Sequence, residues 1–487
     1  MAVQNRIVKV QKRNRALVRY DEARIGKAIL RAASSIGGFQ QDFLPGVNDK
    51  WFAACGNNDE HLATFLSDAV TVCLNGDPHH LIANFPPTIE TIQDEVLHVL
   101  RSYGFQNTAD AYECYRWGRH WMREGALTSE TFMGNGFPQA RMKTSLDWAK
   151  KHHVHSVEGL NEAVRSGKIK KVVHDSIALY EQSLDEAAAK VMERIHGGDK
   201  LRMMWVSGPS SSGKTTTTVK LTQRLEKHGL RFLMLNLDDY FWSLVEHPTD
   251  WINDRNYETP EALDIQLLNQ HLIQLLEGQT VEKPIYSFKE GRRAGSKPVK
   301  LESDQILLLD CLHGLYPPIT EGIDPRAQFR LYIETQNMLY EGDGSTKRLT
   351  KFTDVRLIRR MLRDALHRNH SPIKTILHWH YVRSGELFSI IPLQGLADHV
   401  VNGGFPFDLP ALKPFFSGKD SLMPHEDDFR TYAGFLDAKM RFHRVKALLD
   451  SVEGLSKEDV ANHGIIPGDA VIREFVGGST IKIPHNE

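Results

Sequence analysis

The chain has 487 residues, of which 41% are hydrophobic and 25% are charged, a composition typical of globular proteins and a length sufficient for about two to four domains. Its 60 basic and 61 acidic residues give a formal net charge of -1, so the composition offers no support for a nucleic-acid or a membrane partner. The four scattered cysteines are too few for a disulfide framework. Because the first residues lack a signal-peptide core and no apolar run approaches the ~18 residues of a membrane helix, we expect a cytoplasmic protein.

Residues 6–122 have the pattern of a small separate domain. Two short strands around a turn at Asn14 and Arg15 are predicted between residues 6 and 20. Asp21 can cap the helix that follows. Further helices are predicted at 60–74, 88–103 and 109–121.

From residue 201 the pattern alternates between strands and helices. The predicted strands are 201–206, 231–237, 306–309 and 329–333, and the predicted helices are 216–227, 263–277 and 354–367. Short apolar strands separated by amphipathic helices indicate an α/β fold with a mainly parallel sheet covered by helices on both faces. The segment 123–198 is predicted to be a mostly helical linker, and 411–487 is predicted to be an extension that packs on the α/β domain.

The segment between the apolar run 203–206 and the predicted helix carries the complete motif G-x-x-x-x-G-K-[ST]. In such a loop, backbone N–H groups at the positive end of a helix bind the phosphates of a nucleotide. The motif predicts that Lys214 reaches the β- and γ-phosphates and that the hydroxyl of Thr215 ligates Mg²⁺. A Gly/Ser-rich turn that matches by chance is the alternative, which the two matching flanks disfavour. The residues expected to bind the nucleotide are Gly208, Ser210, Ser211, Ser212, Gly213, Lys214, Thr215 and Thr216.

Two predicted strands are followed by carboxylates, Asp238 and Asp239 after 231–237 and Asp310 after 306–309. Ligands of parallel sheets gather at the carboxyl ends of the strands, and phosphoryl transfer needs Mg²⁺ and a carboxylate that accepts the proton of the acceptor hydroxyl. Because successive residues of an extended chain point to opposite faces, we expect only one of the two neighbouring aspartates to face the phosphates. A helix cap or a turn is the alternative role for either one.

These segments together resemble the uridine kinase and phosphoribulokinase family. The match includes the phosphate loop, L-D-x-Y-F at 237–241, N-Y-E at 256–258, P-I-Y-S-F at 284–288 and D-x-R-L-x-R-R-x-x-R-D at 354–364. The resemblance implies a P-loop kinase that uses ATP and Mg²⁺. The catalytic residues that it implies are Asp238, Lys214, Arg360 and Arg363, and the residues that it associates with the metal are Thr215, Asp238 and Asp310.

The same resemblance implies a substrate site in which Glu258 holds the sugar hydroxyls and aromatic side chains stack on a base. The substrate contacts that it implies are Tyr240, Tyr257, Glu258, Tyr286, Phe288, Arg293, His313, Arg368 and Arg383. The chain departs from uridine–cytidine kinases proper at Gly291, where that group has a pyrimidine-reading histidine, and at 369–371, where it has G-R-D. A longer bacterial uridine-kinase-like subfamily is more similar, because counterparts continue into the tail at 472–479.

The front segment resembles the ATP-cone, a regulatory nucleotide-binding module found in ribonucleotide reductases. The motifs that carry this resemblance are V-x-K-R at 10–13, D-x-x-R-I at 21–25, I-E-x-I-Q-D-E-V at 89–96 and A-x-A-Y-x-x-Y-R at 109–116. By this resemblance, a regulatory ATP or dATP would contact Val10, Lys12, Arg13 and Arg24. A solvent-facing basic hairpin is the alternative.

The sequence therefore predicts an ATP- and Mg²⁺-dependent kinase that phosphorylates a hydroxyl of a nucleoside and is regulated by a nucleotide at its front domain. A kinase of a sugar or a sugar phosphate, and a nucleotide-sensing regulator with weak catalysis, are the alternatives. The predicted domains are 1–122 (regulatory), 123–198 (linker), 199–410 (kinase) and 411–487 (extension). The sequence leaves a homo-oligomer open.

Overall fold

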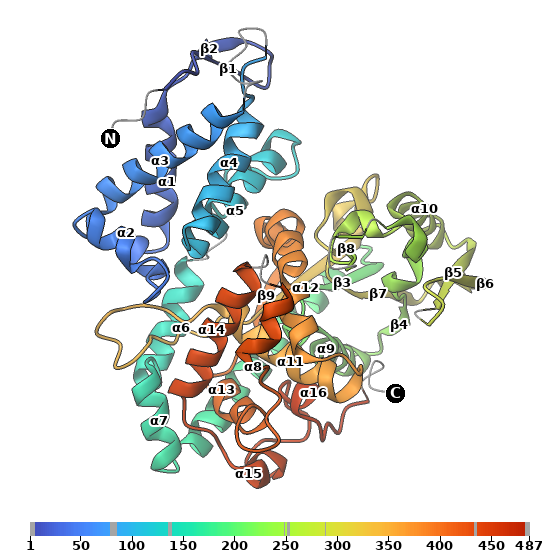
Figure 1. Cartoon of the computed structure of the whole chain (residues 1–487). Coiled ribbons are helices and arrows are strands. Elements are labelled where there is room, and N and C mark those ends of the chain that lie inside the picture. Colours follow the sequence, from blue (N-terminus) through green and yellow to red (C-terminus); the bar gives the residue numbers. More distant parts are fainter. Residues whose placement is uncertain are drawn as a thin grey trace. The chain divides into compact units, whose positions relative to one another are not determined.

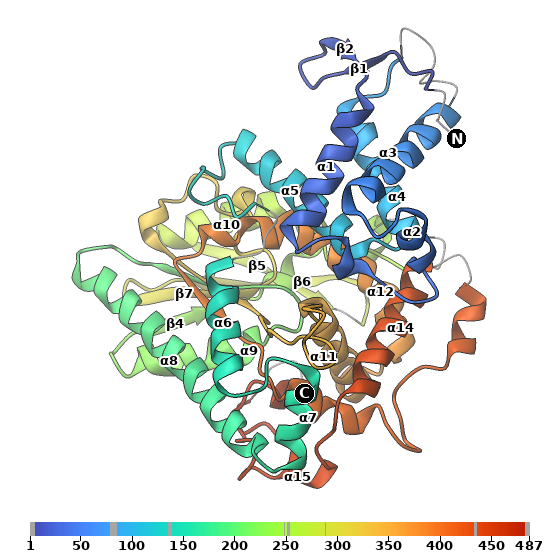
Figure 2. The same cartoon turned by 90° about the vertical axis from the view of Figure 1, so that its left-hand side faces the viewer.

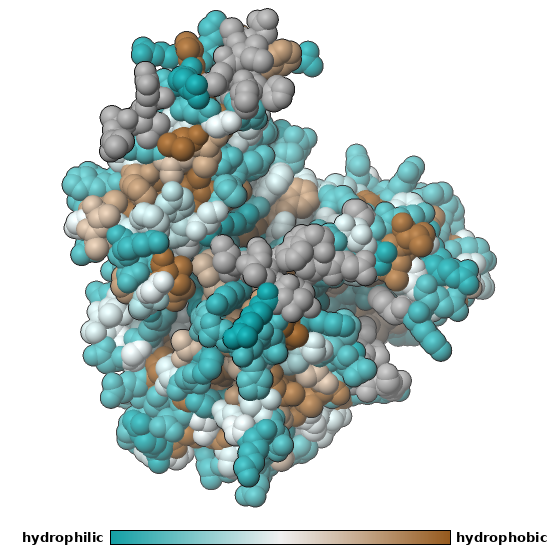
Figure 3. All heavy atoms as spheres, in the orientation of Figure 1, coloured by the Kyte–Doolittle hydropathy of each residue, from teal (hydrophilic) through white to brown (hydrophobic). Residues whose placement is uncertain are grey.

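The computed structural model describes residues 5–77, 85–134, 139–247, 249–250, 254–287, 289–432 and 436–482. The chain divides into two compact units, residues 1–137 and 138–487, and the first of them is coloured blue to cyan in Figure 1. Each unit has a hydrophobic core of its own. On the face drawn in Figure 3, hydrophilic side chains cover much of each unit, with apolar side chains scattered between them. None of the helices in the described part of the chain is long and apolar enough to cross a membrane.

The first unit begins with a hairpin and continues with helices. Strands β1 (Lys9–Gln11) and β2 (Leu17–Arg19) pair antiparallel, and Arg15 in their turn has φ of 64°. The helices are α1 (Glu22–Ser35), α2 (Asp49–Ala54), α3 (Asp59–Gly76), α4 (Ile89–Ser102) and α5 (Gln106–Arg123). The hairpin and the longer helices confirm the prediction. The six-residue α2 is an addition, because so short a helix does not complete a readable apolar period.

The apolar faces of these helices meet in the core of the first unit. Ile29 of α1, Leu66 of α3 and Leu100 of α4 are fully buried, and each such side chain stabilises the fold by about 1.5–3 kcal/mol. The hairpin is attached to the start of α4, because the N–H of Gln11 donates to the carbonyl oxygen of Pro87 at 3.0 Å.

A parallel sheet organises the second unit. Its strands lie in the order β4 (Arg231–Met234), β7 (Gln305–Cys311), β3 (Met203–Ser207), β8 (Gln328–Glu334) and β9 (His399–Asn402). Each neighbouring pair is parallel. Every residue of the central strand β3 is buried, which explains its continuous apolar run. The sheet with its covering helices confirms the predicted α/β fold.

Three described strands of this unit lie outside the predicted set. The edge strand β9 has only four residues. The antiparallel hairpin of β5 (Thr280–Ser287) and β6 (Arg292–Lys300) projects its second strand into solvent, and the polar residues of that strand show no apolar alternation to reveal it.

Helices α8 (Ile169–His196) and α9 (Lys214–Glu226) lie side by side on the sheet, as both views show (Figures 1 and 2). The hydroxyl groups of Tyr180 and Thr217 join them at 2.7 Å, and Lys220 pairs with Glu181 at 2.5 Å. The other α-helices in the described part of the unit are α6 (Gln139–Lys151), α7 (Val157–Arg165), α10 (Ile265–Leu276), α11 (Phe352–His367), α12 (Pro372–Gly385), α13 (Asp408–Leu412), α14 (Leu436–Ser451), α15 (Lys457–Ala461) and α16 (Arg473–Val476).

The strand β4 ends earlier than predicted. It ends at Met234 instead of residue 237, and Asp238 and Asp239 lie in the 3-10 helix Leu237–Tyr240. The side chain of Asn236 accepts a hydrogen bond from the N–H of Asp238 at 3.1 Å, which turns the chain before the aspartates. The carboxylates of Asp238 and Asp239 therefore point in different directions because the chain turns at this place, and not because side chains alternate along a strand.

Candidate active site

The loop between β3 and α9 has the shape and the donors of an anion site. A Cβ atom on Gly208 would overlap the backbone of β8, and one on Gly213, whose φ is 95°, would overlap Val471, so both positions need glycine. The hydroxyl oxygens of Ser211 and Ser212 are buried and have no hydrogen-bond partner among the described residues. Phosphate oxygens at the N-terminus of α9 would satisfy them.

Arginines of α11 hold this loop from one side. Nη1 of Arg356 donates to the carbonyl oxygen of Ser210 at 3.1 Å, and Nη1 of Arg359 donates to that of Ser211 at 3.3 Å. Arg360 reaches the loop as well, because its Nη1 donates to Oγ of Ser210 at 3.2 Å. The first two arginines are fully buried, and we infer that they support the loop, whereas Arg360 faces the substrate side.

Two carboxylates lie at the carboxyl end of the sheet beside the loop. Burial raises the pKa of Asp310 to about 6, against the opposing effects of Lys214 and of a hydrogen bond from Thr215. Burial likewise raises the pKa of Asp238 to about 6, with Arg368 opposing. Two carboxylates and a hydroxyl group are ligands that Mg²⁺ accepts, with water and phosphate oxygens completing its coordination. The residues present therefore fit a magnesium nucleotide.

Glu258 is buried between an arginine and a histidine. Nη1 of Arg360 lies 2.6 Å from its Oε1, and Nε2 of His378 lies 3.6 Å from the same oxygen. Burial alone would raise the pKa of Glu258, but Arg360 and His378 outweigh burial and hold that pKa well below its usual value. An ionised carboxylate accepts hydrogen bonds only, so Glu258 can bind hydroxyl groups of a substrate.

Three arginines gather around the carboxylate of Asp364. Its oxygens lie 3.2 Å from Nε of Arg360, 3.0 Å from Nη2 of Arg363 and 3.9 Å from Nη1 of Arg368. Burial and the charge of Arg363 lower the pKa of Arg368 to about 10. Because Arg360 also pairs with Glu258, three cations face two carboxylates, and the excess of positive charge acts on Asp238 through Arg368.

Aromatic side chains lie beside the 3-10 helix that carries Asp238. The ring centroid of Phe241 is 6.2 Å from that of Tyr257 and 5.8 Å from that of Tyr286. These rings offer a surface on which a base could stack. The predicted contact Phe288 lies outside the described residues.

Other predicted substrate contacts have partners within the protein. Tyr240 is fully buried, and its hydroxyl lies 3.0 Å from Nδ1 of His271. Nη2 of Arg293 donates to the carboxylate of Asp264 at 3.1 Å. Tyr240, in the same 3-10 helix as Asp238, and Arg293, on β6, are thus each held by a partner on α10 or at its N-cap.

Two more predicted contacts, His313 and Arg383, also have partners within the protein. His313 is 4% exposed, burial lowers its pKa to about 4, and its Nδ1 lies 3.1 Å from Oγ of Ser389. Nη1 of Arg383 donates to Glu386 at 2.6 Å, beside the pair that the same glutamate forms with Arg356. A neutral His313 can exchange hydrogen bonds, while Arg383 is held in an ion-pair network.

The structure adds contacts of Lys283, which no motif includes, and of Glu474, which lies in the matched tail 472–479. Lys283 of β5 pairs with Asp239, and the N–H of Tyr286 donates to the same carboxylate at 3.1 Å, so Asp239 is committed to structure. Oε2 of Glu474 accepts a hydrogen bond from Oγ1 of Thr216 at 3.1 Å. These partners lie 44 and 258 residues away, and no local signal connects them.

The predicted regulatory residues lie in the first unit. Nε of Arg13 is 2.5 Å from Glu90, and its Nη2 donates to Gln93 at 3.1 Å, so the hairpin reaches the motif on α4. Val10 is buried, Lys12 is exposed, and Arg24 pairs with Asp21 at 3.1 Å. The charge of Arg13 also acts on Tyr112 of α5. The structure thus brings Arg13 together with α4 and α5, whereas Arg24 pairs on its own helix.

Residues 203–340, which contain the phosphate loop and Asp310, match the model of the Phosphoribulokinase / Uridine kinase family. The chain is 28% identical over 200 residues to a uridine kinase of Deinococcus deserti, covering 41% of this chain and 86% of that one. It is 31% identical over 166 residues to a uridine kinase of Ligilactobacillus salivarius, covering 34% and 68%. Among solved structures, D-glycerate 3-kinase from Cryptococcus neoformans var. grubii aligns with 17% identity and a TM-score of 0.32, over 45% of this chain and 95% of that one.

Proposed function

The chain belongs to the phosphoribulokinase / uridine kinase family, and we propose that this phosphotransferase moves the γ-phosphate of ATP to a hydroxyl group of a nucleoside. The observation that carries the proposal is the grouping of Asp238, Asp310 and Lys214 at the phosphate loop, with Glu258 nearby. The charges of Lys214 and Glu258 both act on Asp238. A base, a phosphate site and a hydroxyl-binding carboxylate are therefore close together, as phosphoryl transfer requires.

In this proposal each side chain has a distinct task. Asp238 accepts the proton of the acceptor hydroxyl, which its raised pKa permits near neutral pH. Glu258 holds neighbouring hydroxyls of the sugar. Lys214, Arg360 and Arg363 neutralise the charge that spreads over the phosphoryl oxygens during transfer.

Thr215 and Asp310 would hold Mg²⁺ beside the nucleotide, and Asp238 would stay free of the ion so that it can serve as the base. When bound, the ion would neutralise charge on the β- and γ-phosphates. The buried hydroxyls of Ser211 and Ser212 support a phosphate chain on this loop. The rings of Tyr257 and Tyr286, both near Phe241, support a nucleoside as the acceptor, because a base can stack there.

Release of ADP should be measured with a panel of nucleosides, pentoses and pentose phosphates. We expect turnover with a nucleoside and none with Lys214→Ala, whose unfolding curve should match that of the parent. Turnover with a pentose or a pentose phosphate alone would replace the nucleoside by a sugar acceptor. Nucleotide binding without ADP release from any acceptor would favour a nucleotide-sensing regulator.

We further propose that the first unit binds ATP or dATP and regulates the kinase. The contact of Arg13 with Glu90 and Gln93 supports this role, because it brings the basic hairpin next to the α4 motif, where both could contact one nucleotide. That unit has a basic hairpin but none of the phosphotransfer motifs found in the second unit. A second nucleotide there would serve control, with a coupling of typically ~1–3 kcal/mol.

Calorimetry with the full chain tests this regulatory site. Changing Lys12 and Arg13 together to Ala should remove one of two nucleotide equivalents and alter the dependence of rate on dATP. The exposed residues Lys9 and Arg19 of the same hairpin, changed together to Ala, are the matched control and should leave both equivalents in place. One equivalent in the parent, unchanged by the Lys12 and Arg13 substitutions, would show that the first unit is not a nucleotide site.

A further inference from the structure

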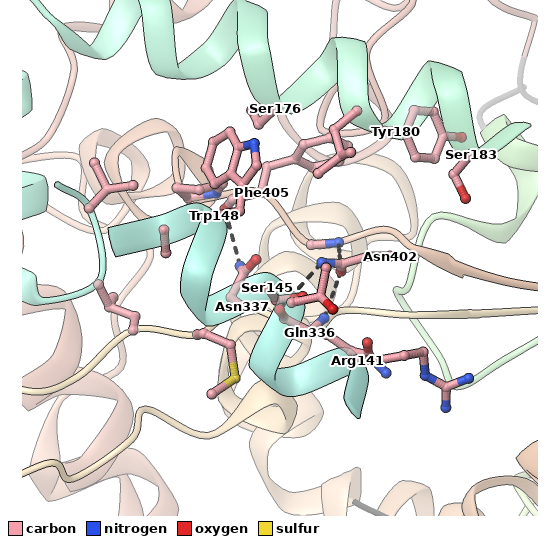
Figure 4. A pocket seen from close by; sticks show the side chains of 18 of the residues that line it. Arg141, Ser145, Trp148, Ser176, Tyr180, Ser183, Gln336, Asn337, Asn402 and Phe405 are labelled. Carbon is pink, nitrogen blue, oxygen red and sulfur yellow. Dashed lines mark hydrogen bonds between the residues drawn. The ribbon is translucent and has the colours of Figure 1, made fainter. Parts of the chain in front are cut away.

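A cavity of about 410 Å³ lies in the second unit, between helices α6 and α8 and the loops that follow β8 and β9. Its volume falls within the range of small-molecule sites. Figure 4 shows side chains from both helices and both loops around it. Side chains that define it are Trp148, Tyr180, Gln336, Asn337, Asn402 and Phe405.

The walls of the cavity combine aromatic rings with amide groups. In Figure 4 the rings of Trp148 and Phe405 lie toward α8, and the amides of Gln336, Asn337 and Asn402 lie together by the strand ends. The amides of Asn337 and Asn402 are fixed by backbone partners, since their Nδ2 atoms donate to the carbonyl oxygens of Phe405 at 3.1 Å and Gln336 at 3.3 Å. Flat apolar walls with a rigid polar edge suit a planar heterocycle.

Buried polar groups at this cavity lack partners. Thr350 is 4% exposed, and its Oγ1 has no hydrogen-bond partner in the part of the chain that the structure describes. The same holds for Nε of Arg141, and the structure records no hydrogen bond of the Gln336 side chain to another described residue. Buried polar groups are normally paired, so a ligand with hydrogen-bonding atoms would complete the site.

The cavity lies on the side of the phosphate loop away from the acceptor residues. The sheet order β4-β7-β3-β8-β9 puts Asp238 and Asp310 on the β4 and β7 side of the loop, and the cavity at the ends of β8 and β9. It is nevertheless joined to the loop, because Tyr180 bonds to Thr217 of α9 at 2.7 Å. Asn337 bonds to Asp408 at 3.1 Å, and that aspartate pairs with the loop-supporting Arg359.

We propose that this cavity binds a nucleobase, either the base of the nucleotide whose phosphates lie on the loop or that of a separately bound nucleoside. Its aromatic rings and its hydrogen-bonding amide edge match a base, and Arg141 of α6 adds a cationic group to its lining. The site is distinct from the proposed acceptor site at Glu258 and from the proposed regulatory site in the first unit.

Photolabelling of the full chain with 8-azidoadenosine and 8-azido-ATP, followed by peptide mapping, tests the proposal. We expect label on peptides that contain Trp148 or Tyr180, with protection by adenosine. Ser145→Phe would fill the cavity from α6, and Gln336→Ala would remove the amide edge. Either change should reduce labelling of these peptides about tenfold, the effect of roughly 1.4 kcal/mol in affinity.

Lys143→Phe is the matched control, because Lys143 is exposed on the same helix and does not line the cavity. Glu258→Gln, on the acceptor side, should leave the cavity label unchanged. Suppression of the 8-azidoadenosine label by saturating ATP would assign the cavity to the base of the donor, and persistence would assign it to a separate nucleoside. Label confined to other peptides, or undiminished in folded Ser145→Phe and Gln336→Ala, would overturn the proposal. ADP release is measured separately, so a failure here leaves the proposed phosphotransfer standing.

Discussion

The raised pKa of Asp238 predicts that turnover falls at acidic pH. The pH at which it falls should depend on Arg368, whose charge lowers this pKa. If this carboxylate is the general base, kcat/KM for the acceptor follows its ionised fraction. With a pKa of about 6, the ionised fraction falls from about nine-tenths at pH 7 to about one-tenth at pH 5. Turnover should therefore be lost as pH falls through 6.

Replacing Arg368 by glutamine should move this limit to higher pH. Among the charges that act on Asp238, Arg368 contributes the largest lowering of its pKa. Loss of a nearby cation typically raises a carboxyl pKa by about one unit or more. A shift from about 6 to about 7 would reduce the ionised fraction at pH 6 from one-half to about one-tenth, a fivefold loss of kcat/KM, with little loss at pH 8.5.

The assay is kcat/KM for the acceptor between pH 4.5 and 8.5, for the parent, Arg368→Gln and Arg326→Gln. Arg326 is the control, because it is an exposed arginine before the amino end of β8, paired with Asp324. Asp310 also has a raised pKa, but its main partners are Lys214, Glu474 and Thr215, so its titration should not move with Arg368. An acidic limit at the same pH in all three proteins would refute Asp238 as the group that titrates.

Three further outcomes follow from the site and its supports. Lys214→Ala should reduce turnover far more than tenfold, which is only about 1.4 kcal/mol, without altering the unfolding curve; turnover within tenfold would remove the loop from the mechanism. Asp238→Asn should lower turnover by a factor of about 10²–10⁴, while calorimetry still shows ATP binding. Asp239→Asn should chiefly lower the free energy of unfolding. If Asp239→Asn lowers turnover more than Asp238→Asn does, then Asp239 and not Asp238 is the base. Asp408→Asn should lower the free energy of unfolding in urea by about 3–5 kcal/mol, because it removes one partner of the buried Arg359 pair, and a change below 1 kcal/mol would contradict that reasoning.

The elements that the sequence pattern predicts best are those whose buried apolar residues follow one another regularly along the chain. The run 203–206 and the helix after Lys214 are found close to their predicted bounds, because a strand covered on both faces must be apolar throughout. The phosphate loop follows from the same local logic, since its glycines, lysine and threonine are contiguous. The 3-10 helix that carries Asp238 is different. Its turn includes a hydrogen bond that the N–H of Asp238 donates to the side chain of Asn236, and no hydrophobic periodicity reveals such a bond.

Partners across long sequence separations are the part that the sequence could not supply. The ion pair of Arg359 with Asp408 spans 49 residues, and the hydrogen bond of Thr216 with Glu474 spans 258. The motif does not distinguish between its four arginines, at 356, 359, 360 and 363. The structure does, because they differ in burial and in their partners. Arg356 and Arg359 are fully enclosed and support the loop, whereas Arg360 reaches Glu258.

The C-terminal segment around α16 changes how the phosphate loop is to be understood. Val471 packs so closely on Gly213 that no side chain fits between them, and the guanidinium of Arg359 lies 4.9 Å from the ring centre of Phe475. The buried carboxylate of Glu474 acts on both Lys214 and Asp310, so it opposes the positive charge of the lysine and adds to the negative charge around the aspartate. Because an anion at the N-terminus of a helix is itself stabilised there, Glu474 occupies an environment that also suits a phosphate. The electrostatics of the loop are therefore set jointly by the loop itself and by a tail residue some 260 positions further along the chain.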